Sequence, residues 1–236
     1  FLTTNVIEVN LEGEIKKVYT EDGKTLEAKV IIVSTGADHR KLDVKGEEEF
    51  ANMGVSYCAT CDGPFFMGLD IFVVGGGDSA LEEALYLTKF AKSVTIIHRR
   101  DQFRASQVVV DKIKANGKVK LVLDSVVHEI KGDKEAKSVV VENVKTGELT
   151  ELKSDNNNPI GVFIFVGYIP QTKIFEGKLD MNYGYIVTND DMKTNIEGVF
   201  AIGDTREKSV RQMVTAAGDG CIAAVVANRY LDGQAW

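Results

Sequence analysis

A strand, a glycine turn and a helix follow one another near the centre of the sequence. Residues 71–74 are continuously apolar, as in a strand buried on both faces, and a glycine-rich run at 75–80 follows directly. An amphipathic stretch at 81–90 and a second apolar strand at 94–97 complete a βαβ unit. Because parallel strands need a crossover of this kind, the sequence predicts an α/β fold with a parallel sheet.

The turn itself has the pattern GxGxxA. Gly75 allows the tight turn, Gly77 lets a pyrophosphate approach the backbone, and Ala80 lets the helix pack closely on the strand. Asp78 and Ser79 complete the turn at the helix N-terminus, which faces the anion. With a strand before it and a helix and strand after it, the pattern predicts a dinucleotide-binding site.

The end of the second strand indicates which dinucleotide binds. A site for NAD usually has an acidic residue about 20 residues beyond the glycines, where it binds the ribose 2′-hydroxyl. This sequence instead has His98, Arg99 and Arg100 there, with Arg104 one helical turn later. Guanidinium groups suit a 2′-phosphate, so we predict NADPH, the alternative being a solvated basic patch.

A CxxC motif precedes the glycine turn. Cys58 and Cys61 can close a small disulfide ring, and Asp62 beside them can move the proton that disulfide chemistry requires. The alternative is half of a zinc site, which needs two more ligands. The third cysteine, Cys221, is expected to be a buried small residue on a distant helix. The histidines lack ligand spacing: His39, His98 and His128.

Composition narrows the function classes. A chain of 236 residues is long enough for two domains. Its net charge of -7 argues against general nucleic-acid binding, which requires a basic surface. No apolar run approaches the roughly 20 residues that span a bilayer, so no membrane role is indicated. Three cysteines do not form a secreted disulfide framework, and a cytoplasmic setting is expected.

Two further strands end in glycine. The apolar run at 30–33 is expected to be buried on both faces and leads to Thr35 and Gly36, where the backbone can approach a ligand. The strand at 199–202 leads to Gly203 and Asp204, which can bind a polyhydroxyl chain or can simply form a turn or helix cap.

The last helix is expected at 214–230. Arg211 and Gln212 lead into it, and Val214 begins it. The helix is rich in alanine and glycine, so it can pack close to a sheet or a planar ligand.

The remaining elements follow from periodicity and turn residues. We expect a helix at 107–114, a loop at 155–159, and strands at 6–11, 15–20, 25–30, 119–127, 138–144, 161–166 and 184–187. The charged stretch at 42–50 and Pro170 mark two places where the chain can cross between domains.

In this order the segments resemble the low-molecular-weight, bacterial-type thioredoxin reductases, which are FAD/NAD(P)-dependent pyridine nucleotide-disulfide oxidoreductases. The matching stretches are STGA (34–37), CATCDG (58–63), GGGDSALEEA (75–84), HRRDQFRA (98–105), VGYIPQT (166–172), AIGD (201–204), RQMVTAAGDG (211–220) and RYLDG (229–233).

The resemblance implies two Rossmann-like, three-layer domains, with the NADPH-binding domain inserted into the FAD-binding domain. The FAD-binding domain would comprise residues 1–42 and 168–236, and the NADPH-binding domain with its CxxC redox centre would comprise 43–167. Electrons would pass from NADPH through FAD and the disulfide to thioredoxin or a thioredoxin-like protein. The resemblance also implies a homodimer.

The resemblance assigns roles to the redox residues. Cys61 resembles the sulfur that faces the flavin, Cys58 the sulfur that attacks the partner's disulfide, and Asp62 the acid and base. Phe65 and Phe66 resemble an exposed aromatic pair near the partner's docking surface, the alternative being ordinary packing.

The resemblance also assigns cofactor contacts. FAD contacts are implied for Gly203, Asp204, Arg211, Gln212 and Val214. The 2′-phosphate site would comprise Arg99, Arg100 and Arg104.

The family begins with its own strand and glycine-rich turn for the FAD pyrophosphate. No counterpart precedes Phe1, so we expect this sequence to lack the N-terminal part of the FAD domain. Three alternatives stay open: the flavoprotein component of an alkyl hydroperoxide reductase, a non-catalytic NADPH-binding module, and a zinc-binding structural module.

Overall fold

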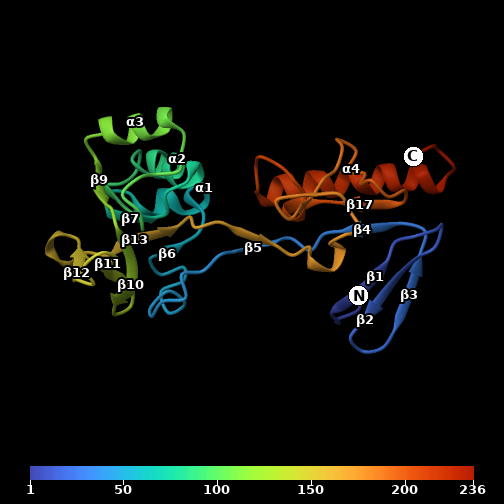
Figure 1. Cartoon of the computed structure of the whole chain (residues 1–236), viewed down its shortest axis with the longest axis horizontal. Coiled ribbons are helices and arrows are strands. Elements are labelled where there is room, and N and C mark those ends of the chain that lie inside the picture. The colour runs from blue at the N-terminus through green and yellow to red at the C-terminus, as the bar shows by residue number, and fades with distance from the viewer. The chain divides into compact units, whose positions relative to one another are not determined.

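The computed structural model describes the backbone of residues 1–236 and every side chain except that of Asn156. The chain forms two compact units (Figure 1). We call Phe1–Asp38 together with Tyr168–Trp236 the split unit, and His39–Gly167 the inserted unit. The boundaries at 42 and 167, and the assignment of FAD and NADPH to the two units, stay predictions.

The inserted unit is built on a five-stranded parallel sheet. Its strand order is β6 (Val55–Ser56), β13 (Ile160–Ile164), β7 (Asp70–Val74), β8 (Ser93–Ile97) and β9 (Val119–Val122). The central strand β7 is followed by α2 (Asp78–Leu87), and β8 is followed by α3 (Gln107–Ala115). The predicted α/β class with a parallel sheet is confirmed.

Alternate residues of β7 pack into different layers, because successive side chains of a strand point to opposite faces. Ile71 and Val73 belong to a core shared with α2 and α3, which includes Leu81. Phe72 and Val74 belong to a second core shared with an antiparallel sheet. That sheet comprises β10 (Ser125–Gly132), β11 (Ala136–Asn143) and β12 (Leu149–Lys153).

Figure 1 shows the resulting three layers, with α2 and α3 on one side of the parallel sheet and β10 to β12 on the other. Ile71, Val73, Val94 and Ile96 are fully buried in this arrangement. Each buried aliphatic side chain stabilises the fold by about 1.5–3 kcal/mol, so the sheet is a rigid base for the residues at its carboxyl edge.

The split unit contains small sheets and one long helix. An antiparallel meander comprises β1 (Val6–Asn10), β2 (Lys16–Thr20) and β3 (Thr25–Ala28), and β4 (Ile31–Val33) pairs in parallel with β17 (Val199–Ala201). The helix α4 (Met213–Leu231) packs Ala223 and Ala227 with Phe200 of β17. A short hairpin pairs β15 (Met181–Asn182) with β16 (Tyr185–Ile186).

The remaining elements are short. The two chain segments that join the units pair as β5 (Ala37–His39) and β14 (Tyr168–Pro170). The short helices are α1 (Ala59–Asp62), η1 (Gly63–Phe66), η2 (Asp155–Asn157), η3 (Lys173–Phe175) and η4 (Gly203–Thr205). The loop predicted at 155–159 contains η2, and the Asn156 side chain lies outside the described atoms.

Three secondary-structure predictions need correction. The strand predicted at 119–127 is divided into β9 and β10 because Asp124 has a left-handed backbone with a φ of 52°. The helix predicted at 81–90 begins earlier, at Asp78, and ends at Leu87. The strand predicted at 184–187 is only two residues long, and β12 was not predicted at all.

Two burial predictions were wrong. Ile32 in β4 is 38% exposed, because among the described residues β4 pairs with β17 alone and one side of it stays open. Cys221 is exposed rather than buried. It lies two residues before the buried Ala223, and residues two apart on a helix point to different sides.

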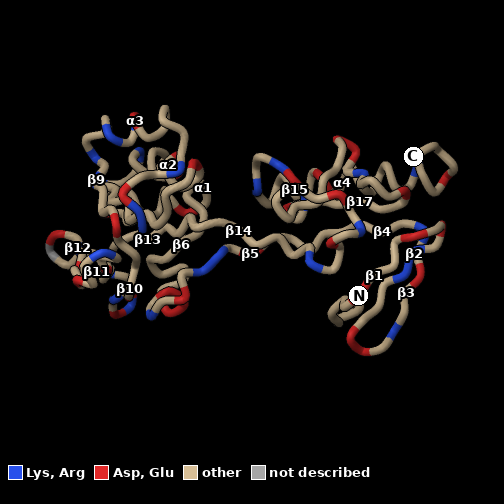
Figure 2. The backbone as a smooth tube through the Cα atoms, viewed as in Figure 1, with Lys and Arg blue, Asp and Glu red and all other residues tan. Residues whose placement is uncertain are grey.

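Charge is distributed over both units. Figure 2 shows acidic and basic residues interspersed along the chain, with no long uniformly basic stretch. Among the described residues, no helix is long and apolar enough to cross a bilayer.

Candidate functional site

Cys58 and Cys61 form a disulfide at the end of β6. The chain leaves the sheet after Ser56 and turns into the one-turn helix α1, with Cys58 as its N-cap residue. This turn brings the two Cα atoms within 5.3 Å of each other, a separation that a disulfide can bridge. The predicted disulfide ring is confirmed.

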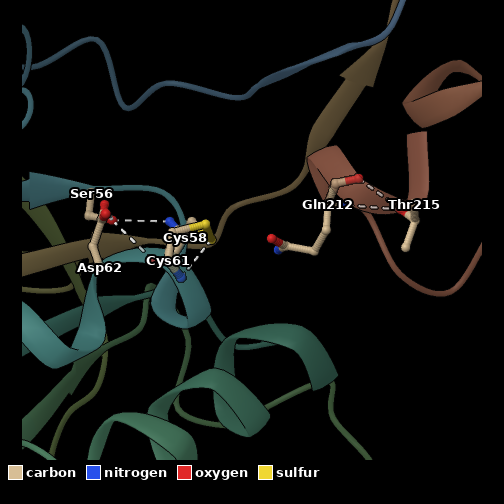
Figure 3. Close-up of a disulfide and its surroundings, with 6 residues drawn as sticks. All are labelled: Ser56, Cys58, Cys61, Asp62, Gln212 and Thr215. Atoms are coloured by element: carbon tan, nitrogen blue, oxygen red, sulfur yellow. Dashed lines mark hydrogen bonds between the residues drawn. A yellow bond between two sulfur atoms is a disulfide. The ribbon is translucent and has the colours of Figure 1, made fainter. Parts of the chain in front are cut away.

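Hydrogen bonds around the disulfide link it to Asp62 (Figure 3). The Ser56 hydroxyl donates to Asp62 Oδ2 at 2.7 Å and accepts the Cys58 backbone N–H at 3.1 Å. The Cys61 backbone N–H donates to Cys58 Sγ at 3.1 Å. A carboxylate is therefore held beside a sulfur pair, which is an arrangement suited to two-electron exchange coupled to proton transfer.

The alternative of a zinc site has no support from the side-chain arrangement. In the disulfide both sulfurs are oxidised, whereas zinc is bound by thiolates. No group of three or more His, Cys, Asp or Glu side chains is placed to hold a metal ion in the part of the chain that the structure describes.

In the glycine turn after β7, Gly75 and Gly76 have no space for a side chain, whereas Gly77 has open space beside it. A Cβ on Gly75, whose φ is 152°, would lie 2.6 Å from the Cβ of Ala80. A Cβ on Gly76 would lie 2.2 Å from the His98 ring, whereas a Cβ on Gly77 would meet no atom within 4 Å. Gly77, the N-cap residue of α2, therefore faces space in which an anion can approach the backbone.

The two remaining predicted residues of the turn, Asp78 and Ser79, are exposed at the start of α2. The Asp78 carboxylate accepts a hydrogen bond from the Ser106 backbone N–H at 2.8 Å. This bond ties the loop after β8 to the glycine turn.

His98 lies beneath the turn and not at its open surface. Its side chain is only 7% exposed, and its ring stacks on Phe103 with 5.3 Å between centroids. Burial lowers the His98 pKa, the nearby positive charges of Arg100, Arg99 and Arg104 lower it further, and a hydrogen bond to the Gln102 carbonyl acts in the opposite sense. The imidazole is therefore neutral near pH 7 and supports Gly76 by packing.

The three arginines beside His98 are exposed. Among the described residues, Arg99, Arg100 and Arg104 have no ion pair with an acidic side chain. The Arg104 backbone N–H donates to the Gly76 carbonyl at 2.9 Å, which places this loop against the glycine turn. Three unpaired guanidinium groups next to an open glycine are suited to bind a phosphate.

In the split unit, two buried side-chain atoms have no hydrogen bond to any side chain or backbone group that the structure describes. Asp204 Oδ1 and Arg211 Nε are buried without a hydrogen-bond partner among the described residues. Buried polar groups are almost always hydrogen-bonded. The two atoms therefore indicate a ligand that donates a hydrogen bond to Asp204 and accepts one from Arg211. The Arg211 guanidinium also lies 4.2 Å from the centroid of the Tyr185 ring. These residues fit a polar cofactor such as FAD.

The other predicted FAD contacts surround the same elements. Gly203 begins η4 with a φ of 68°, and Gly36 has a φ of 73°. Thr35 Oγ1 and Thr205 Oγ1 are 3.0 Å apart and share a hydrogen bond, which joins the two glycine-containing loops. The roles predicted for these residues stay predictions.

Gln212 and Val214 lie at the start of α4. Gln212 is the N-cap residue and forms a capping box with Thr215, whose hydroxyl accepts the Gln212 backbone N–H at 3.3 Å (Figure 3). Val214 is 76% exposed and is available for an apolar contact.

Sequence reasoning missed Asp219, which lies within α4 and is 7% exposed. Its carboxylate accepts hydrogen bonds from the Gly203 backbone N–H at 2.9 Å, Arg206 Nε at 2.9 Å and Lys208 Nζ at 2.8 Å. Asp219 therefore anchors η4 to the helix. The available signal was one acidic residue in a helix of small apolar residues, shortly after two basic residues in a loop.

The predicted aromatic pair is divided. Phe65 is 80% exposed, as the resemblance implies, whereas Phe66 packs on Phe163 with 5.1 Å between ring centroids. Of these two residues, only Phe65 is an exposed aromatic surface residue.

Comparison with known proteins decides the family. Residues 1–220 match the family described as pyridine nucleotide-disulphide oxidoreductase. The chain belongs to that family. The predicted resemblance to thioredoxin reductases within this oxidoreductase family is also confirmed by the relatives of the chain.

Among the relatives of this oxidoreductase, the thioredoxin reductase of Peptoclostridium acidaminophilum is 48% identical over 231 residues, covering 97% of this chain and 73% of the relative. The crystal structure of thioredoxin reductase from Streptococcus pyogenes is 48% identical, with a TM-score of 0.90, covering 98% of this chain and 74% of that one. A thioredoxin reductase from Giardia duodenalis, 39% identical, also has a TM-score of 0.90, over 98% of this chain and 75% of that one.

Proposed function

We propose that this oxidoreductase reduces thioredoxin or a thioredoxin-like protein with electrons from NADPH, passed through FAD and the Cys58–Cys61 disulfide. The observation that carries the proposal is the disulfide held beside Asp62, in the same unit as a glycine turn flanked by unpaired arginines. The thioredoxin reductases among its relatives support the choice of acceptor.

NADPH would bind at the carboxyl edge of the parallel sheet. Gly77 and the N-terminus of α2 would hold the pyrophosphate, because a Cβ there would meet no protein atom within 4 Å. Arg99, Arg100 and Arg104 would bind the 2′-phosphate, because they are exposed and unpaired among the described side chains. His98 would support the turn from below.

FAD would bind in the split unit. Asp204 and Arg211 would contact it with the buried atoms that have no partner among the described residues. Further contacts would come from Thr35, Gly36, Gly203, Gln212 and Val214. When bound, FAD supplies the two-electron relay between the nicotinamide and the disulfide.

The reduced cysteine pair would then reduce the acceptor. The Cys58 thiolate attacks one sulfur of the acceptor's disulfide and forms a mixed disulfide, and the Cys61 thiolate attacks Cys58 Sγ and releases the second acceptor thiol. Asp62 takes the proton from a cysteine thiol and returns it to the leaving sulfur. Two electrons pass to the acceptor, and the Cys58–Cys61 disulfide forms again.

The assembly and compartment stay predictions of this proposal. We expect a homodimer, as the resemblance implies, and a cytoplasmic setting, as the cysteine usage indicates. Light scattering on the purified protein measures the first directly.

The test is an absorbance spectrum of the purified protein before and after NADPH is added without oxygen, followed by addition of oxidised thioredoxin. Flavin bands that bleach with NADPH and return with thioredoxin support the proposal. Absence of flavin bands, or no recovery with thioredoxin, contradicts it.

A further inference from the structure

Ser56 hydrogen-bonds to both Cys58 and Asp62 but has no role in the proposed electron path. It is the last residue of β6 and is 4% exposed. Its backbone position is fixed by parallel pairing with Phe163 of β13. The side chain therefore points from a rigid sheet and has little contact with water.

The Ser56 hydroxyl has a defined direction. It accepts the Cys58 backbone N–H at 3.1 Å, so its own hydrogen is available to an acceptor. Two acceptors lie within reach, Asp62 Oδ2 at 2.7 Å and the Cys58 carbonyl oxygen at 3.4 Å. The carboxylate is closer and charged, so the hydrogen bond to Asp62 is the stronger one (Figure 3).

Only one oxygen of the Asp62 carboxylate is engaged in this way. Asp62 Oδ2 accepts the Ser56 hydrogen bond, whereas Oδ1 accepts no hydrogen bond from any described residue. A carboxylate held by one oxygen keeps a fixed orientation and leaves the second oxygen available to exchange a proton.

We propose that Ser56 is a positioning residue for proton transfer at the Cys58–Cys61 centre, acting through the Asp62 carboxylate. The inference deepens the proposed function and rests on it only in requiring that the cysteine pair cycles between dithiol and disulfide. In that cycle Asp62 takes a proton from a cysteine thiol, and the hydrogen bond from Ser56 keeps its carboxylate oriented toward this task.

A purely structural role for the hydroxyl makes a different prediction. If Ser56 only completes the packing of β6, its replacement changes stability but not the rate of thiol-disulfide exchange. Ser138 is a matched control, because it is a 5% exposed strand serine whose hydroxyl donates to the Glu151 carboxylate at 2.6 Å in the same unit.

The experiment uses the full chain with Cys221→Ser in every variant, because the exposed Cys221 thiol would release an equivalent of its own. The protein is reduced with excess dithiothreitol and freed of it, and its reaction with 5,5′-dithiobis(2-nitrobenzoate) is followed. It needs no NADPH or thioredoxin. The dithiol gives two electrons to the reagent, its disulfide closes, and two equivalents of coloured thiol are released. The second equivalent reports ring closure.

We expect Ser56→Ala to slow release of the second equivalent on the order of tenfold, the effect of losing one hydrogen bond to a charged group. Asp62→Asn slows it further, and the double variant is no slower than Asp62→Asn alone, because Ser56 acts through Asp62. Ser138→Ala leaves the rate unchanged.

The proposal is overturned if Ser56→Ala reacts as fast as Ser138→Ala, or if the losses of Ser56→Ala and Asp62→Asn multiply. Should Ser56→Ala not fold, Ser56→Thr and Ser56→Val give the same decision, since they share a shape and differ by the hydroxyl. The Ser56→Thr variant must then release the second equivalent faster than the Ser56→Val variant. If exchange behaves as expected but NADPH does not drive thioredoxin reduction, the proposed function fails and this inference stands.

Discussion

The Asp219 carboxylate in α4 accepts the backbone N–H of Gly203 at 2.9 Å and so holds the first residue of η4 against the helix. Burial, the largest single influence, acts to raise the Asp219 pKa, but hydrogen bonds from Arg206, Lys208 and Gly203 together lower it to about 2. The ionised form is therefore favoured by the fold.

This linkage predicts a dependence of stability on pH. An unfolded aspartate has a pKa of about 3.9, so the contribution of Asp219 is present above about pH 4 and is lost as the pH falls towards 2. Asp219→Asn should lower the free energy of unfolding at pH 7 by about 2 kcal/mol and reduce this acid dependence. Urea unfolding at pH 7 and pH 3 measures both.

Asp191→Asn is the control for that prediction, because Asp191 is exposed and lies 3.8 Å from Lys193. An ion pair with an exposed carboxylate at this distance contributes little to stability. Equal losses from Asp219→Asn and Asp191→Asn would contradict the anchoring role.

The glycine turn allows a comparison of two neighbouring positions. Gly76→Ala should destabilise the inserted unit, because its Cβ would lie 2.2 Å from the His98 ring, whereas Gly77→Ala should leave stability unchanged. Gly77→Ala should instead weaken NADPH binding, because its methyl group would occupy the space that the pyrophosphate needs. Thermal unfolding and calorimetric titration separate the two effects, and the opposite pattern would show that the turn does not bind the pyrophosphate.

His98 should contribute to stability in its neutral form. Since burial lowers its pKa, its contribution is present above the unfolded pKa of about 6.5 and is lost as the pH falls below that value. His98→Ala should destabilise the protein by about 1–3 kcal/mol, and the exposed His128→Ala by less than about 0.5 kcal/mol. Chemical unfolding at pH 8 measures the stability of both variants. Equal losses of stability in His98→Ala and His128→Ala would contradict the packing role of His98.

The arginines should decide the choice of nicotinamide cofactor. Replacing Arg99 and Arg100 with serine should weaken NADPH binding by about a hundredfold or more and NADH binding hardly at all, because each lost charge-assisted contact to a phosphate costs about 1.5–3 kcal/mol. Exposed Lys112 and Lys114 on α3, replaced in the same way, serve as the control. Equal losses for NADPH and NADH would show that the arginines do not bind the 2′-phosphate.

Local pattern predicted the elements whose neighbours are close in sequence. The strand, turn and helix of the βαβ unit follow from continuous apolar residues and GxGxxA, and the structure has them as β7, Gly75 to Ala80, and α2. The CxxC disulfide likewise depends on two residues in one turn. These features need no information about distant parts of the chain.

Features that depend on distant residues were not predictable in the same way. The exposed side of α4 could not be identified, because small residues occur all around the helix. Cys221 was therefore correctly predicted to lie on this helix but wrongly predicted to be buried. The prediction that Ile32 is buried was wrong, because an apolar run in the sequence does not show how many strands flank it. The Asp219 network joins residues from η4, a loop and α4, and the Ser56 hydrogen bond depends on how the chain turns after β6.

The most direct test of the electron path is to count the thiols of Cys58 and Cys61. The flavin-loaded protein is treated without oxygen with one equivalent of NADPH, alkylated under denaturing conditions and analysed by peptide mass spectrometry. The account predicts that both cysteines change from disulfide-linked to alkylated while the thiol of Cys221 is alkylated with or without NADPH. A Cys58–Cys61 disulfide that survives while NADPH is consumed would contradict it.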